Sequence, residues 1–435
     1  MAALRGKARW TVWTTVLAMA VVPAACDTLS NPLEVEPASR IPAADLETPA
    51  NAQILSDGAV GDFECAFNSY NAQGGTIGEE FIYAQQTASR TPYDRRNTTI
   101  NDPDYAVNSC TGLGVYTPLQ IARQSNENLL ALLAGWTGEE VAAGPGAPSR
   151  TNLIAIASAY AGYAYVLLGE GFCTMAISSV NVDKTLNYGG EIQPDSVFKL
   201  GIARFTEAIA AAAAANNTSI ETMAYLGRAR AKLNIADYAG AKADAQEVTA
   251  GYVRLVTASD VSPRRQNRIT AENSVLNRSL SVGHVYRTIN DTRVPVTATA
   301  LTSATGVVHF YQTKYPTTAT AIPLATYEEA QLIIAEADIR AGSLLTALPI
   351  LNASRARGGQ GVFLGVTQAD YLAELIDQRR RELFAESHHL GDVIRYDIEL
   401  TPAAGTPYHF GGTYGTQICL PLPAAERLNN PLIGG

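Results

Sequence analysis

Residues 223–245 read Met-Ala-Tyr-Leu-Gly-Arg-Ala-Arg-Ala-Lys-Leu-Asn-Ile-Ala-Asp-Tyr-Ala-Gly-Ala-Lys-Ala-Asp-Ala. Apolar and small side chains recur here with the spacing of two successive helices, and Tyr238 begins the second. Ala229 and Ala241 are small, as required where two antiparallel helices approach closely. The stretch predicts a helix pair, and one pair cannot bury its own apolar face, so it must stack on others.

Helical periodicity covers most of the remaining chain. Amphipathic or alanine-rich segments of helical length occupy residues 54–70, 118–135, 151–168, 195–215, 221–235, 238–250, 326–341, 343–356 and 368–387. The pair at 326–356 resembles the first, and both resemble tetratricopeptide units, which stack into arrays. No fixed period of about 34 residues runs through the chain, so we expect helix pairs separated by long insertions.

Two long stretches, which we call the excursions, interrupt the helical pattern. Residues 71–117 are rich in Gly, Asn, Thr, Tyr and Pro, and residues 251–322 are rich in Thr, Val, Ser and Tyr. The second excursion alternates around Gly306–Gln312, which favours short strands or a hairpin. Loops of this length inside a compact protein are uncommon and tend to be functional.

Composition and charge exclude several classes of protein. The 435 residues are 47% hydrophobic and 17% charged, as in an ordinary globular protein. Removing Arg5, Lys7 and Arg9 with an N-terminal signal would lower the net charge from −9 to −12. Such an acidic chain is poorly suited to nucleic acids or to electrostatic docking on anionic lipid, which both need clustered Lys and Arg.

The N-terminus has the order of an export signal. A basic segment precedes the apolar run Trp10–Val22, which is shorter than the ~20 residues of a spanning helix, and Ala24-Ala25-Cys26 follows. We expect residues 1–25 to be a signal peptide and Cys26 to be lipidated, with simple secretion after Ala25 or nearby as the alternative. Residues 26–49, rich in Pro, Ser, Thr and acids, form the expected linker, and 50–435 the single folded domain. The lipid anchor would be the chain's contact with the membrane.

Four further cysteines, in an exported chain, are candidates for two disulfides. They are Cys65, Cys110, Cys173 and Cys419. Cys65–Cys110 is the first pairing to consider because both residues lie in the N-terminal third, and buried free thiols are the alternative.

Motifs for catalysis or metal binding are missing from the sequence. The five His form no His-Glu-x-x-His, the Cys form no Cys-x-x-Cys, and there is neither a Gly-x-Ser-x-Gly elbow nor a phosphate loop. Ser196-Val-Phe-Lys199 fits the Ser-x-x-Lys pattern, but its usual partner motifs are missing and Ser196 sits where a helix begins. We therefore predict no catalytic residues, no metal site and no cofactor.

Six segments in the C-terminal half occur in an order typical of one family. They are Asn290–Arg293, Lys314-Tyr315, Tyr327–Ala337, Leu351–Arg357, Ile376–Glu386 and Ile418–Glu426. With the lipoprotein-like start, they resemble the SusD/RagB family of surface nutrient-binding lipoproteins. The resemblance implies a mainly α, SusD-like array of tetratricopeptide-type helix pairs with long irregular insertions and minor β structure.

The resemblance also implies a function. A SusD-like protein would be an outer-membrane, surface-facing lipoprotein that captures oligosaccharide or peptide and delivers it to a TonB-dependent transporter barrel. A tetratricopeptide-type scaffold that binds other envelope proteins is the alternative. The charges of the Arg379–Glu386 segment, spaced three and four residues apart, favour salt bridges over ligand contacts.

Aromatic residues in the excursions are the candidate ligand contacts, because sugar C–H groups bind flat apolar faces flanked by polar groups. The candidates are Tyr83, Tyr93, Tyr105, Tyr116, Tyr286, Tyr311 and Tyr315. Trp136 would be the only Trp after loss of the signal, which favours a peptide or a polymer other than starch.

Overall fold

The computed structural model describes residues 43–142, 149–181, 185–276, 278–303 and 306–433. The chain divides into two units, residues 1–46 and 47–435. The described part of the first unit is the short helix α1 (Ala43–Leu46). The expected signal peptide and lipidation site lie outside the described residues, so the fold below is that of the second unit.

All nine predicted helices are present in this unit. They are α2 (Ala52–Ile77), α5 (Tyr116–Gly135), α7 (Arg150–Gly171), α8 (Pro194–Ala214), α9 (Thr218–Asn234), α10 (Tyr238–Ala245), α12 (Tyr327–Arg340), α13 (Leu344–Arg357) and α14 (Gln368–Glu382). Shorter helices are α3 (Thr91–Arg95), α4 (Pro103–Val107), α6 (Gly138–Val141), α11 (Arg268–Thr270), α15 (His389–Tyr396) and α16 (Ala424–Asn429). The mainly α prediction is confirmed.

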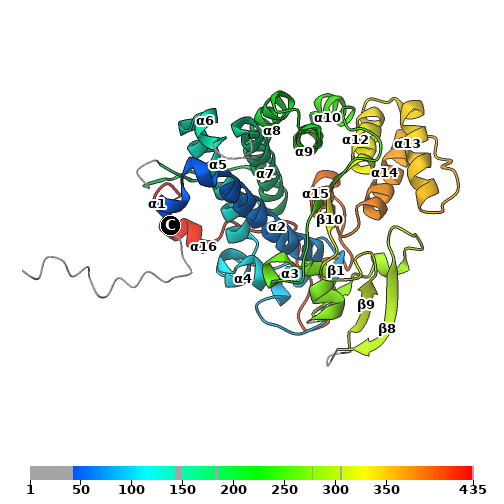
Figure 1. The fold of residues 1–435 in the computed structure, drawn as a ribbon. Helices are drawn as coiled ribbons and strands as arrows, with labels where there is room; N and C mark the ends of the chain where they lie inside the picture. The colour runs from blue at the N-terminus through cyan, green and yellow to red at the C-terminus, as the bar shows by residue number, and fades with distance from the viewer. Residues whose placement is uncertain (1–42, 143–148, 182–184, 277, 304–305, 434–435) are drawn as a thin grey trace, which may run out of the picture. The chain divides into compact units, whose positions relative to one another are not determined.

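The long helices pack in chain order. Helix α7 contacts α8, α8 contacts α9, α9 contacts α10, α10 contacts α12, and α12 contacts α13 and α14, as their succession across the view shows (Figure 1). In the pair α9–α10, Ala229 and Ala241 are fully buried. The side chains of Asn217 and Asp237 cap the two helices by accepting from the amides of Ile220 and Gly240. The predicted stacking of helix pairs is therefore confirmed.

Close helix contacts require small residues in the array. A Cβ added to Gly227 of α9 would lie 2.3 Å from the ring of Phe205 on α8, so only glycine allows this approach. Helix α7 is long and apolar enough to cross a membrane, but 83% of its most apolar window is buried inside the protein. That burial identifies α7 as the central core helix of the array.

Within the described residues, the β structure consists of five two-stranded antiparallel sheets. The pairs are β1 (Phe81–Tyr83) with β7 (Leu280–Val282), β6 (Val253–Val256) with β10 (Ile322–Thr326), β2 (Met175–Ala176) with β5 (Glu191–Ile192), β3 (Ser179–Val180) with β4 (Leu186–Asn187), and β8 (Val296–Thr302) with β9 (Val308–Gln312). The hairpin expected in the second excursion is β8–β9, and the β1–β7 pair joins the two excursions.

The first excursion is less irregular than predicted, because α2 continues to Ile77. Asn, Gln and Gly suggested a loop after residue 70, yet 71–77 are buried. Asn71 donates to the backbone oxygen of Ala385, and Thr76 donates to that of Ala72. These bonds hold two of the polar side chains inside the core, so tertiary context overrides local preference.

Two disulfides link distant parts of the unit. Cys65 is bonded to Cys110, the pairing considered first from the sequence, and Cys173 is bonded to Cys419. The first ties α2 to the loop before α5 across 45 residues. The second ties the end of α7 to the C-terminal segment across 246 residues.

Candidate functional site

The motif residues of the C-terminal half form an ion-pair network centred on α14. Arg293 binds Asp291 through two nitrogens, at 2.9 and 2.7 Å, and reaches Glu382 of α14 at 2.7 Å. Arg357 of α13 meets the same Glu382 carboxylate at 2.9 Å. Lys314 pairs with Glu386 at 2.7 Å. The partners come from different elements, so these charges fasten loops and helices together.

A second part of the network is deeply buried between α12, α14 and α15. Asp392 accepts from Arg379 at 2.8 Å and from Arg395 at 2.9 Å, and Arg395 continues to Glu336 at 2.8 Å. Burial by itself would raise the pKa of Asp392, but the two guanidinium groups outweigh burial and hold that pKa well below its usual range. Asp392 is therefore ionised, and its carboxylate is occupied by Arg379 and Arg395. We call these charged residues the ion-pair network: Asp291, Arg293, Lys314, Glu336, Arg357, Arg379, Glu382, Glu386, Asp392 and Arg395.

The seven candidate tyrosines do not form a groove. Six of them, Tyr83, Tyr93, Tyr105, Tyr116, Tyr286 and Tyr315, are at most 6% exposed, and Tyr311 is half-buried. Tyr286 stacks on Phe384 at 5.0 Å, and Tyr83 donates to Gln73 at 3.0 Å. The tyrosines fill the core because the excursions fold back on α2 and on the segment after α14. The prediction of a tyrosine-lined groove is wrong for five of the six buried rings, which border no described pocket, and the sixth, Tyr116, borders a different pocket.

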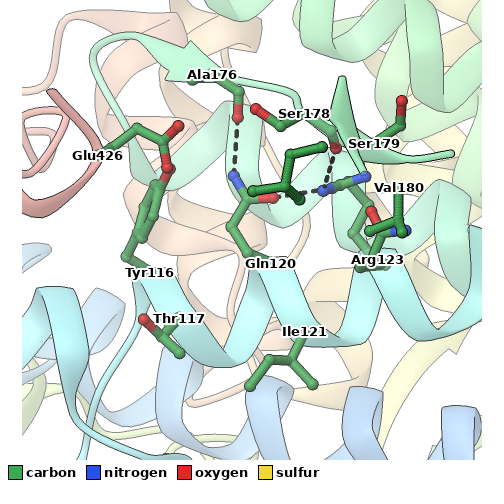
Figure 2. Close-up of a pocket in the computed structure, with 12 residues that line it drawn as sticks. Tyr116, Thr117, Gln120, Ile121, Arg123, Ala176, Ser178, Ser179, Val180 and Glu426 are labelled. Atoms are coloured by element: carbon green, nitrogen blue, oxygen red, sulfur yellow. Dashed lines mark hydrogen bonds between the residues drawn. The ribbon is translucent and has the colours of Figure 1, made fainter. Parts of the chain in front are cut away.

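Tyr116 is the one candidate tyrosine that borders a described pocket, which we call the helix pocket (Figure 2). It holds about 260 Å³ between α5, the β2–β4 segment and α16. Figure 2 shows its polar groups bonded to each other: Gln120 donates to Ala176 O at 3.0 Å and Arg123 to Ser178 O at 2.9 Å. Tyr116 donates to Glu426 at 2.8 Å. These bonds leave Ile121, Leu186 and their neighbours as a small apolar wall.

A larger pocket lies where the two excursions meet, and we call it the loop pocket. It holds about 730 Å³. It is lined by Ala84, Gln85, Gln86, Val275, Leu276, Arg278, Leu301, Thr302, Ser303 and His309. Every one of these residues belongs to residues 71–117 or 251–322. The loop pocket therefore lies in the excursions that carry the candidate contacts, although none of the seven candidate tyrosines lines it.

The geometry of the loop pocket is set by short elements. Strand β1 ends at Tyr83, and the chain that follows it places Gln85 and Gln86 in the pocket lining. Strands β8 and β9 carry Leu301 and His309. Beneath them, Ile82, Ala84 and Val307 form a small apolar cluster with Phe410 packed against it. A rigid floor of this kind suits a site whose polar groups stand on loops.

Several polar groups of the loop pocket have no protein partner within the described chain. Arg278 is exposed and forms no ion pair, and its φ of 51° places it in the left-handed region. His309 is buried, and its Nδ1 lacks a hydrogen-bond partner. An unmade hydrogen bond of a buried group costs about 1–3 kcal/mol, which a bound ligand or water can recover. Burial, followed by the positive charges of Arg278 and Arg287, lowers the pKa of His309 and keeps the ring neutral near pH 7.

Chemistry beyond binding has no support in the described residues. They contain no group of three or more His, Cys, Asp or Glu side chains that could hold a metal ion. Ser196 and Lys199 both lie exposed in the first turns of α8. The arrangement of the loop pocket provides hydrogen bonds, a positive charge and apolar contacts, which suit recognition.

The sequence did not single out Gln86, Arg278 or Leu301 as candidate contacts. Arg278 carried a usable signal, because no Asp or Glu lies between Glu272 and Asp291. Its charge therefore lacks a partner nearby in the chain. Leu301 carried no signal, since its position in the pocket depends on how the hairpin folds against β7 and β1.

Comparison with known proteins agrees with this architecture. The model of the SusD family matches residues 294–420. The comparison with curated proteins found no match. Among solved structures, a SusD-like carbohydrate binding protein from Bacteroides vulgatus superposes with a TM-score of 0.66 at 14% identity, covering 89% of this chain and 97% of that one.

Two further structures show the same fold. A SusD-like protein from Bacteroides fragilis has a TM-score of 0.66 at 11% identity, covering 89% of this chain and 97% of that one. A SusD superfamily protein from Parabacteroides distasonis has a TM-score of 0.64 at 14% identity, covering 88% and 98%.

A helical array with long insertions defines the fold as SusD-like. The resemblance inferred from the six segments is confirmed: the chain has the fold of SusD superfamily proteins, and its residues 294–420 match the SusD family.

Proposed function

We propose that this protein is a cell-surface binding lipoprotein that captures oligosaccharide nutrient in the loop pocket and passes it to a TonB-dependent transporter. The observation that carries the proposal is the loop pocket itself. Its described lining comes from the two excursions, and it places Arg278 and the unpartnered Nδ1 of His309 in the same lining as exposed Leu276 and Leu301. Sugars need this mixture, because they offer hydroxyl groups and C–H faces together.

Anchoring and delivery complete the proposal. The apolar run ending at Ala25-Cys26 supports lipidation of Cys26 and cleavage of residues 1–25, and the polar residues 26–49 would act as a tether. One acyl chain binds a membrane only marginally, so stable anchoring requires more than one. Mass spectrometry of the native N-terminal peptide tests this part: an acylated Cys26 supports it, and an unmodified N-terminus at another residue ends it.

The pocket is tested by filling it. Leu301→Trp places a large ring in the loop pocket at a position that is 41% exposed, so the fold should tolerate it. Leu345→Trp, at an 84% exposed position on α13, is the matched control. Calorimetry of the mature protein against a panel of oligosaccharides and peptides should show at least about a tenfold loss of affinity for the first variant alone, because the ring takes the ligand's volume. Equal affinities for both variants would refute the site, and binding of peptides instead of oligosaccharides would change the ligand class.

A scaffold that binds other envelope proteins is the second candidate, and one surface favours it. The connection between α13 and α14 leaves three large apolar side chains standing in solvent: Val362 is 70% exposed, Leu364 83% and Val366 80%. Exposed apolar groups gathered in this way often mark protein contacts. Replacing all three with Ser should abolish co-purification of a partner barrel or another envelope protein from native membranes, while oligosaccharide affinity stays unchanged. Unchanged co-purification would exclude this surface.

A further inference from the structure

The loop pocket contains a positive charge and no acidic side chain among its described lining residues. This is unusual for the chain, which carries 41 acidic against 32 basic residues. Arg278 stands in the lining without an ion-pair partner in the described structure. Elsewhere the arginines of the ion-pair network meet carboxylates at 2.7–2.9 Å. Arg278 therefore differs from the arginines of the ion-pair network.

The surroundings of the pocket add to its positive charge. One buried carboxylate, that of Glu272, forms ion pairs with both Arg90 at 3.2 Å and Arg268 at 3.6 Å. Arg287 lies over the ring of Phe310 at 4.4 Å, and it lowers the pKa of His309 together with Arg278 after the larger effect of burial. A low dielectric beneath the pocket strengthens such fields.

One further acid lies nearby, on the other side of β1. Asp94 accepts from the amide of Tyr83 at 2.9 Å, and burial raises the pKa of its carboxyl to about 7. Near neutral pH, Asp94 therefore carries only part of a negative charge. Asp94 therefore offsets the positive charge of Arg287 only in part.

We propose that the loop pocket selects acidic oligosaccharides, with Arg278 binding the carboxylate of a uronic acid or the sulfate ester of a sulfated sugar. The proposal rests on the proposed function and specifies its ligand class. Guanidinium groups bind such anions through two parallel hydrogen bonds. The amide of Gln86 and the hydroxyl of Thr302 line the same pocket and can bind sugar hydroxyl groups around that charge.

The strained backbone of Arg278 is consistent with this role. A non-glycine residue with φ of 51° is uncommon, because this backbone conformation is energetically unfavourable for residues with a side chain. The conformation holds the arginine at the pocket, and the described structure offers no ion pair in return. An anionic ligand would supply that missing interaction.

The experiment combines a glycan array with calorimetry on the full mature chain. The array carries acidic oligosaccharides, both uronates and sulfated sugars, beside neutral ones. Calorimetry then uses tri-galacturonate, its carboxyl-reduced neutral form, a sulfated galactan disaccharide and tri-glutamate. The variants are Arg278→Gln and Arg278→Lys, with Lys199→Gln as control because Lys199 is an exposed cation on α8, away from the pocket.

The expected result is that acidic sugars bind about tenfold or more tightly than neutral ones, and that this advantage shrinks as salt is raised. Arg278→Gln should remove the advantage, Arg278→Lys should restore part of it, and Lys199→Gln should leave it intact. Comparison of the affinities for tri-galacturonate and for the sulfated galactan disaccharide shows which anion the pocket prefers.

Three results would overturn the proposal, and they are distinguishable. Equal affinity for acidic and neutral sugars, unaffected by Arg278→Gln, refutes the ligand class but leaves oligosaccharide capture standing. Tighter binding of tri-glutamate than of any acidic sugar assigns the pocket to peptides. Binding of no sugar on the array refutes the proposed function together with this inference.

Discussion

The ion-pair network and the loop pocket both contain arginine, but the residue has a different role in each. In the network, Arg379, Arg395 and Asp392 are buried and paired at 2.8–2.9 Å. In the loop pocket, Arg278 is exposed and unpaired, and a neutral His309 has an unpartnered Nδ1. Charges that already satisfy one another hold a scaffold, whereas charges left open are available for a ligand. Pairing, more than residue type, separates the two roles.

The largest expected effect comes from breaking the network at its most buried acid. Asp392→Ala leaves Arg379 and Arg395 without their shared carboxylate, and removal of one partner from a buried pair costs roughly 3–5 kcal/mol. Asp377→Ala is the control, because its pair with Arg381 lies within one helix and is partly exposed, so it should cost about 1 kcal/mol or less. Denaturant unfolding measures both, and equal losses would show that the network is not a scaffold.

A somewhat smaller loss is expected when the long disulfide is removed. The double variant Cys173→Ala and Cys419→Ala frees a loop of 246 residues and should cost about 2–5 kcal/mol. Removing Cys65–Cys110, which spans 45 residues, should cost about 1.5 kcal/mol less, since loop entropy grows with the logarithm of length. Melting of the two variants under the same conditions compares them, and the reverse order would contradict this account.

Asp94 sharpens the comparison through pH, because it is a buried acid outside the network. Burial raises its folded pKa to about 7 from 3.8, so between these values the folded state holds a proton that the unfolded state has lost. Asp94 therefore makes stability fall as pH rises through that window, by roughly 1.4 kcal/mol per pH unit at most. Asp94→Asn cannot ionise and should gain stability over the wild type from pH 5 to pH 7. If the unfolding free energies of the wild type and of Asp94→Asn change with pH in the same way, the prediction is wrong.

The smallest change in stability is expected in the loop pocket. Leu276 is 54% exposed, so Leu276→Ser should alter the unfolding free energy by no more than about 0.5 kcal/mol. The same change removes an apolar contact to the ligand and should weaken oligosaccharide binding several-fold. Loss of stability without loss of affinity would mean that Leu276 is a structural residue.

Much of the fold could be predicted from the sequence, because helical periodicity is a local signal. Ala229, Ala241 and Tyr238 indicated one pair, and the remaining helices followed by the same spacing. The extension of α2 to Ile77 could not be predicted, because the buried amide of Asn71 donates to Ala385, more than three hundred residues away. Local composition suggested a loop there, but a hydrogen bond to a distant carbonyl group favours the helix.

The sequence indicated a region for the candidate site but not the residues that line the pocket there. The excursions were expected to carry the site because they lack helical pattern, and the loop pocket lies between them. Tyr93 and Tyr286 were expected to line it, but each is at most 1% exposed. Burial of a tyrosine depends on which distant elements cover it, such as Phe384 over Tyr286, and short irregular segments carry no periodicity that reveals this.

Hydrogen exchange with and without bound oligosaccharide tests most directly whether ligand binds at the loop pocket and not at the network. Peptides covering residues 84–90 and 296–312 should exchange more slowly when the ligand is bound, because it covers the ends of β1 and the β8–β9 hairpin. Peptides covering residues 376–396 should be unchanged. Protection of residues 376–396, or of α5 beside the helix pocket, with none at the hairpin would contradict the assignment.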